Sequence, residues 1–190
     1  MTENPIVAMA NKFRDAIGTK SKFTLSEISQ LAAVPLYYPA SNPTSTLDIN
    51  GIAQSGAALV DVHGGDTLTY TFKYNIATPK LLRKLVGSKA YLSLTLPLVK
   101  YTNPSTYVAT TVAQTIKILK NDGTELFSPI TINDGNTDYA YVNLKRKEPL
   151  TNELVDYLIT NQPIKAQYTN VGSHDGSQIN STAVLAFNLY

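Results

Sequence analysis

The sequence predicts a mainly β protein: an antiparallel β-sandwich of jelly-roll or Greek-key type, with an N-terminal helical arm and short crossover helices. Residues 66–76, DTLTYTFKYNI, alternate strictly between apolar and polar side chains, as in a strand with one buried and one solvated face. About eight or nine such segments follow one another with turn signals at the spacing of a sandwich. Only 16% of the residues are charged, and Thr, Asn, Ser and Tyr supply the polarity instead. That composition suits sheet surfaces and proteins packed against neighbours.

The 190 residues fit one domain with an appendage, which we divide into a helical arm (1–34), a Pro-rich linker (35–46) and the sandwich (47–190). The net charge of +2 is spread along the chain, so we expect no direct binding of nucleic acid. The absence of cysteine excludes disulfides and thiolate metal sites. Because no apolar run is long enough to span a membrane and no secretory signal begins the chain, we expect a soluble protein.

Residues 4–17 predict the first helix of the arm, with Asn4 as the N-cap, Pro5 in the first turn and Gly18 after the last. Its apolar residues recur at spacings of three and four and form one narrow stripe. The stripe consists of Ile6, Ala10, Phe13 and Ile17. It packs either on the chain's own sheet or on another subunit, and for the second case we name Ile6, Phe13 and Ile17 as interface candidates.

A capping box, Thr24 to Glu27, opens a second helix that ends near Val34. Its sequence, TLSEISQLAAV, resembles the first helix and turn of a bacterial helix-turn-helix. A recognition helix should follow, but the three prolines of PLYYPASNP prevent one there. We therefore set DNA reading aside.

The sandwich begins after the linker, and its strands are predicted in chain order. They are 47–49, 57–62, 66–76, 91–99, 110–119, 125–132, 139–144, 164–171 and 182–190. Short helices are predicted at 78–86 and 151–160, and Asn121-Asp122-Gly123 predicts a hairpin turn. Pro97 argues for an edge position of strand 91–99 or a bulge near its end.

Both histidines, His63 and His174, lie in Gly-rich loops beside an acid: Asp61 or Asp66 for the first and Asp175 for the second. Such loops can present a general base or a metal ligand, but no metal-binding histidine spacing and no G-x-S-x-G turn accompanies them. We interpret both as exposed loop histidines, and we assign no catalytic residue, no metal ligand and no cofactor.

Two further segments have more than one interpretation. The oxygen-rich run Asn133–Asp138 could bind calcium, yet it misses the EF-hand pattern, and turn chemistry alone explains its residues. Calcium binding there stays open. Lys145-Arg146-Lys147, the one tight basic cluster of the sequence, is interpreted as a solvated strand end, although it could also contact a phosphate or an acidic surface.

Four of the 12 tyrosines lie in or beside predicted loops, where aromatic rings can stack on sugars or anchor a protein interface. Tyr37 and Tyr38 are in the linker, and Tyr101 and Tyr107 flank the loop N-P-S-T. We name all four as interface candidates.

The combination of an N-terminal helical arm, a Pro-rich linker and a Thr-, Asn- and Tyr-rich β-sandwich without Cys or Trp resembles small virion proteins of tailed bacteriophages. These are auxiliary capsid, decoration and head-fibre proteins. The resemblance implies a non-enzymatic structural subunit that is made in the host cytoplasm, resides in the virion, forms homo-oligomers and binds other capsid or virion proteins. The alternative is a carbohydrate-binding or receptor-binding sandwich, which would carry coplanar exposed tyrosines with Asn and Asp beside them.

Overall fold

A computed structural model describes the parts of the chain on which the following account rests. These are residues 37–38, 44–76, 79–97, 101–102, 109–110, 115–131, 137–138, 143–170 and 177–188. The predicted helices at 4–17 and 24–34 lie outside this part of the chain, as do most of the run Asn133–Asp138 and His174.

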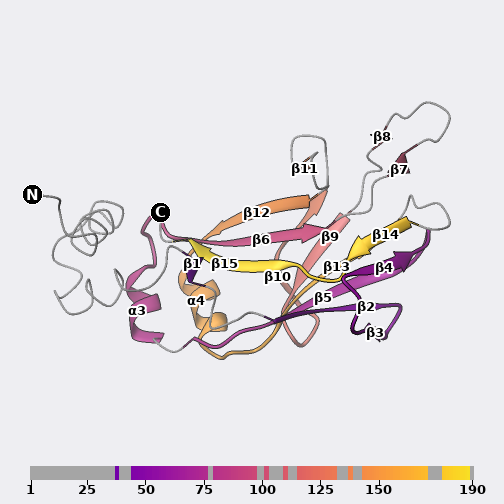
Figure 1. Ribbon diagram of the computed structural model, residues 1–190. Helices are drawn as coiled ribbons and strands as arrows, with labels where there is room; N and C mark the ends of the chain where they lie inside the picture. Colours follow the sequence, from indigo (N-terminus) through magenta and orange to yellow (C-terminus); the bar gives the residue numbers. More distant parts are fainter. Residues whose placement is uncertain are drawn as a thin grey trace, which may run out of the picture.

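The described chain is mainly antiparallel β-structure, as predicted, and most of it belongs to two larger sheets (Figure 1). One sheet has six strands in the order β10 (Glu125–Thr131), β9 (Thr115–Leu119), β13 (Ile164–Thr169), β5 (Thr67–Lys73), β2 (Thr44–Ile49) and β3 (Ile52–Gln54). The other has five in the order β1 (Tyr37–Tyr38), β15 (Val184–Asn188), β6 (Tyr91–Pro97), β12 (Asn143–Pro149) and β11 (Thr137–Asp138). Two-stranded ribbons are formed by β14 (Ser177–Asn180) with β4 (Leu59–Val62) and by β7 (Tyr101–Thr102) with β8 (Ala109–Thr110).

Strand β5 lies inside the six-stranded sheet, between β13 and β2. Its alternation has the predicted consequence, because Leu68, Tyr70 and Phe72 are fully buried while the residues between them face outward. The five-stranded sheet contributes the alternate leucines of β6 and the inward side chains of β15 to the same hydrophobic core. The Tyr168 hydroxyl of β13 donates a hydrogen bond to the carbonyl of Pro97 on β6 (2.8 Å), which links the two sheets through this core.

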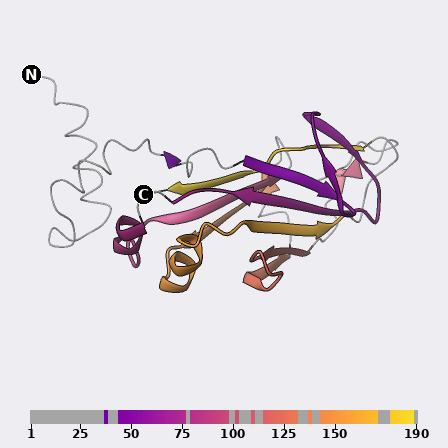
Figure 2. The same cartoon turned by 90° about the horizontal axis from the view of Figure 1, so that it is seen from below.

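Two short helices carry the chain from one sheet to the other, as predicted. Helix α3 (Pro79–Lys84) connects β5 with β6, and α4 (Asn152–Leu158) connects β12 with β13. Both lie at one end of the sheets, where an Arg83–Asp156 ion pair joins them (2.5 Å; Figures 1 and 2). Because both also bury leucines in the core, they close that end of it. No helix of the described segments has the length and apolar character needed to cross a membrane.

The prediction of an edge position for the strand with Pro97 is wrong, since β6 lies between β15 and β12. Tyr91–Pro97 also pairs residue by residue with β12, without a bulge. Proline is tolerated because Pro97 is the last residue of the strand, where little of the hydrogen-bonded ladder remains. Its carbonyl is then free to accept the Tyr168 hydroxyl.

Several strand boundaries also differ from the predicted ones. The linker 35–46 contains β1 and the first residues of β2, while the predicted loop after β13 contains β14. These strands lack apolar alternation and exist because β15, β5 and β4 offer them a partner. Of the strand predicted at 139–144, the described residues 143 and 144 belong to β12 (Asn143–Pro149), which extends beyond the predicted end. Strand β3 was not predicted.

Candidate functional site

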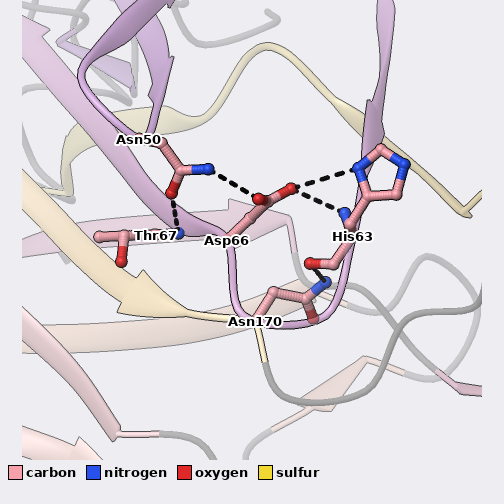
Figure 3. A network of polar contacts seen from close by, with 5 residues as sticks. All are labelled: Asn50, His63, Asp66, Thr67 and Asn170. Carbon is pink, nitrogen blue, oxygen red and sulfur yellow. Dashed lines mark hydrogen bonds and ion pairs between the residues drawn. The ribbon is translucent and has the colours of Figure 1, made fainter.

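Five polar residues meet at the end of the molecule away from the helices, and we call them the polar turn cluster (Figure 3). They come from the β2–β3 turn, the β4–β5 turn with the first residue of β5, and the residue that follows β13. The cluster consists of Asn50, His63, Asp66, Thr67 and Asn170.

Each of the two turns of the cluster contains a glycine with a positive φ angle. Ile49 pairs with Ile52 across Asn50 and Gly51, whose φ angles are 53° and 83°, so Asn-Gly forms a two-residue hairpin of the type I′ class. In the second turn the Asp66 N–H donates to the His63 carbonyl (3.2 Å), and Gly65 has a φ of 92°. A side chain would be strained at both glycines.

Asp66 is the centre of the cluster. One carboxylate oxygen accepts the Asn50 side-chain amide (2.7 Å), and the other accepts the backbone N–H of His63 (2.7 Å). The His63 backbone hydrogen bond, followed by the Asn50 amide, lowers the pKa of Asp66 from 3.8. Asn50 in turn accepts the Thr67 N–H through its side-chain oxygen (2.8 Å). The carboxylate therefore ties the β2–β3 turn to the β4–β5 turn.

Asn170 holds the end of β13 beneath the β4–β5 turn. Its side-chain amide donates to the His63 carbonyl (3.0 Å), its backbone N–H donates to Asp66 O (2.7 Å), and its own carbonyl accepts the Gly65 N–H (2.7 Å). The residue is fully buried, and within the described part of the chain its side-chain oxygen has no hydrogen-bond partner. Three of its polar groups therefore form hydrogen bonds that hold the β4–β5 turn in place.

His63 is the member of the cluster that reaches solvent, with 61% of its side chain exposed. This confirms the prediction of an exposed loop histidine. Of its two candidate acids, Asp66 lies 3.6 Å from its Nδ1, whereas Asp61 accepts the side-chain amide of Gln178 (3.0 Å). Within the described ranges, no three His, Asp or Glu residues gather as a metal site would require. We interpret the cluster as a structural tie between three elements.

A second feature lies beside the cluster, in residues 51–59, GIAQSGAAL, which we call the β3 edge segment. No residue of it is charged, and all but Gln54 are exposed. Ile52 is 68% exposed and Leu59 50%. Ile52 pairs with the buried Ile49, so both lie on the same face of the sheet, but Ile52 extends past the part that is covered. Sequence reasoning missed this segment, although Asn50-Gly51 between two isoleucines is a recognised hairpin signal.

The structure separates the tyrosines that we predicted as interface residues. Tyr37 and Tyr38 form β1 and pair with Asn188 and Phe187 of β15, near the helices. Tyr101 belongs to β7, which Figures 1 and 2 place toward the other end of the molecule. Four predicted interface residues lie outside the described part of the chain: Ile6, Phe13, Ile17 and Tyr107.

The basic cluster Lys145-Arg146-Lys147 is not a solvated strand end, because it lies in the middle of β12. Arg146 is 19% exposed and pairs with Glu148. It also donates to the Ser128 carbonyl (2.9 Å) and lies 5.3 Å from the ring of Phe127, both on β10. Arg146 thus joins the edge strand of one sheet to the other sheet.

Comparisons with known proteins give no relative from which to transfer a function: no family model, no curated protein and no solved structure matches this chain.

Proposed function

We propose that this chain is a non-enzymatic structural subunit of a viral particle of the tailed-bacteriophage type. It binds neighbouring subunits through its N-terminal arm and the surface of its β-domain. The observation that carries the proposal is the β3 edge segment, a run of nine uncharged residues of which all but Gln54 are exposed.

Charged side chains are depleted in the cores of protein interfaces, because desolvating them is costly. A surface that keeps Ile52 and Leu59 exposed and places no charge between them has the composition of such a core. Val184, 52% exposed on β15, adds an apolar side chain from the other sheet. These features favour contact with another protein over contact with water.

We also propose that the two larger sheets form a sandwich of jelly-roll or Greek-key type. Their shared core and the two helices that pass between them support this arrangement. In such a subunit the sandwich supplies a rigid body, and its turns and edges supply the contacts. The polar turn cluster has a matching role, because it fixes the β2–β3 hairpin that carries the edge segment.

The proposal is tested by mass spectrometry of virus particles purified from cultures in which the chain is made. Its peptides should remain with the particles through density-gradient sedimentation, in constant ratio to the major shell protein. A chain that stays entirely in the free-protein fraction contradicts a role in the particle.

Carbohydrate binding, the alternative from the sequence, relied on exposed tyrosines that share one rim. The separation of β1 from β7 gives no support to a platform that combines Tyr37 and Tyr38 with Tyr101. We therefore do not propose it as a second function.

A further inference from the structure

We propose that strand β3 is a self-association site, at which the β3 edges of two copies pair antiparallel about a two-fold axis near Ala53. The inference rests on the proposed structural role and specifies the partner and the surface. The pairing would join the two six-stranded sheets into one continuous sheet.

The first step concerns the backbone of β3. Ile49 and Ile52 close the two-residue turn and form a hydrogen-bonded pair, so the next residue, Ala53, directs its N–H and carbonyl away from β2. No strand of the described residues pairs with β3 on that side. Unpaired donors and acceptors of an exposed edge are a template for another strand.

The second step compares the two edges of the same sheet. The opposite edge, β10, contains Pro129, which has no N–H to donate, and its pairing with β9 is interrupted by two register shifts. Proline and bulges are the usual devices that keep an edge from pairing with another molecule. The β3 edge segment contains no proline and no charge, and its pairing with β2 is regular.

The third step selects a second copy as the occupant. Pairing of β3 with β10 of another molecule would build an open fibre, and the features of β10 disfavour it. Pairing of β3 with β3 is closed, and it brings no like charges together because residues 51–59 are uncharged. Ile52, which lies on β3 and is 68% exposed, loses further contact with water in this pairing.

The chain has no cysteine, which makes disulfide trapping a direct test. Single substitutions Ile52→Cys, Ala53→Cys and Gln54→Cys are made in the full chain, and covalent dimer is measured under mild oxidation. Residues directly opposite each other in antiparallel strands are about 4.5–5.5 Å apart at Cα, within the range of a disulfide. We expect a maximum at or next to residue 53, on the order of tenfold above the control Glu153→Cys.

The control replaces Glu153, whose side chain is 83% exposed, on helix α4. Helix α4 lies at the end of the molecule away from β3 (Figure 1). As a second measurement, light scattering across concentration should detect a dimer of the unmodified chain, and Ala53→Lys should abolish it. Circular dichroism shows whether each variant is folded. Ala53 is exposed, so Lys there disturbs no buried contact.

A monomer at every concentration, or equal cross-linking at residues 53 and 153, overturns the inference. An oligomer that Ala53→Lys leaves intact also overturns it, but leaves the structural role standing. Conversely, if residue 53 is cross-linked but the protein is absent from virus particles, the proposed dimer stands and the proposed role in the particle is wrong. The two proposals therefore fail separately.

Discussion

At the scale of single residues, the buried tyrosines differ in what their hydroxyl groups contact. The Tyr168 hydroxyl donates to Pro97 O (2.8 Å) and that of Tyr70 to Asn180 O (2.6 Å). The buried hydroxyl of Tyr74 has no hydrogen-bond partner among the described residues. Burial raises the pKa of all three from its usual value of 10.0. Among the described contacts, the hydrogen bonds of Tyr168 and Tyr70 compensate the cost of burying their hydroxyl groups.

This contrast predicts opposite effects of the same substitution. Tyr168→Phe should lower the free energy of unfolding by about 1 kcal/mol, because it removes a hydrogen bond and leaves a buried carbonyl without its donor. Tyr74→Phe should be neutral or stabilising, because it removes an unpaired buried hydroxyl. Urea unfolding of both variants measures the difference. Equal destabilisation would mean that the Tyr74 hydroxyl has a partner in solution.

The polar turn cluster predicts a dependence of stability on acid. Because the pKa of Asp66 is lowered in the fold from 3.8, its contribution is complete above that value. The contribution is lost as the pH falls below 3.8 through the folded pKa. Asp66→Asn should therefore show a weaker loss of stability over this range than the unmodified chain. Unfolding midpoints between neutral pH and pH 3 measure it, with Asp61→Asn, outside the cluster, as the control.

At the scale of elements, α4 depends on its cap. The Thr151 side chain accepts the N–H of Leu154 (3.2 Å), and the helix then buries Leu154, Val155 and Leu158. Thr151→Ala should cost about 1 kcal/mol of stability, since one donor of the first turn loses its partner. Thr151→Ser keeps the oxygen and should cost much less. Thermal unfolding distinguishes the two, and equal losses would show that the hydroxyl does not cap the helix.

The elements predicted correctly are those with a local signal. In each case the residues that predict the element are close together in the sequence. This holds for the alternation in β5 and β6, the Asn-Asp-Gly hairpin between β9 and β10 and the helix after Thr151. Strands β1 and β14 depend on distant partners, so their short sequences carry no pattern of their own. The charged run of β12 was not predicted to lie within a strand. Its Arg146 is stabilised there by contacts to Ser128 and Phe127 on β10, and no pattern in the neighbouring residues predicts those contacts.

The candidate site was predictable to a similar extent. His63 and Asp66 are neighbours in a Gly-rich turn, and the sequence left Asp61 and Asp66 as alternative acids beside His63. Asn50, which contacts Asp66, lies 16 residues before it, and Asn170, which contacts His63, lies 107 residues after it. Over such separations the spacing in the sequence does not predict a contact. The β3 edge segment did have a signal in Asn50-Gly51. Its exposure, however, depends on how far the other elements extend over the sheet.

At the scale of the whole molecule, the arm and the β-domain are predicted to have separate tasks. Deletion of residues 1–23 should abolish assembly with neighbouring subunits and leave the β-domain folded, because the described core contains no residue before Leu47. Light scattering measures the assembly, and circular dichroism with urea unfolding measures the fold. A deletion that unfolds the domain would show that the arm belongs to the core.

The position of β13 has a consequence for the order of synthesis. It occupies the middle of the six-stranded sheet, between β9 and β5, and it pairs Thr67 with Thr169. Until the ribosome has released residues 164–169, β5 and β9 therefore lack the strand that joins them, and each has an open edge. A chain that ends at residue 160 should consequently be digested rapidly by protease, whereas the full chain resists it. The subunit can fold only after nearly all of it has been made.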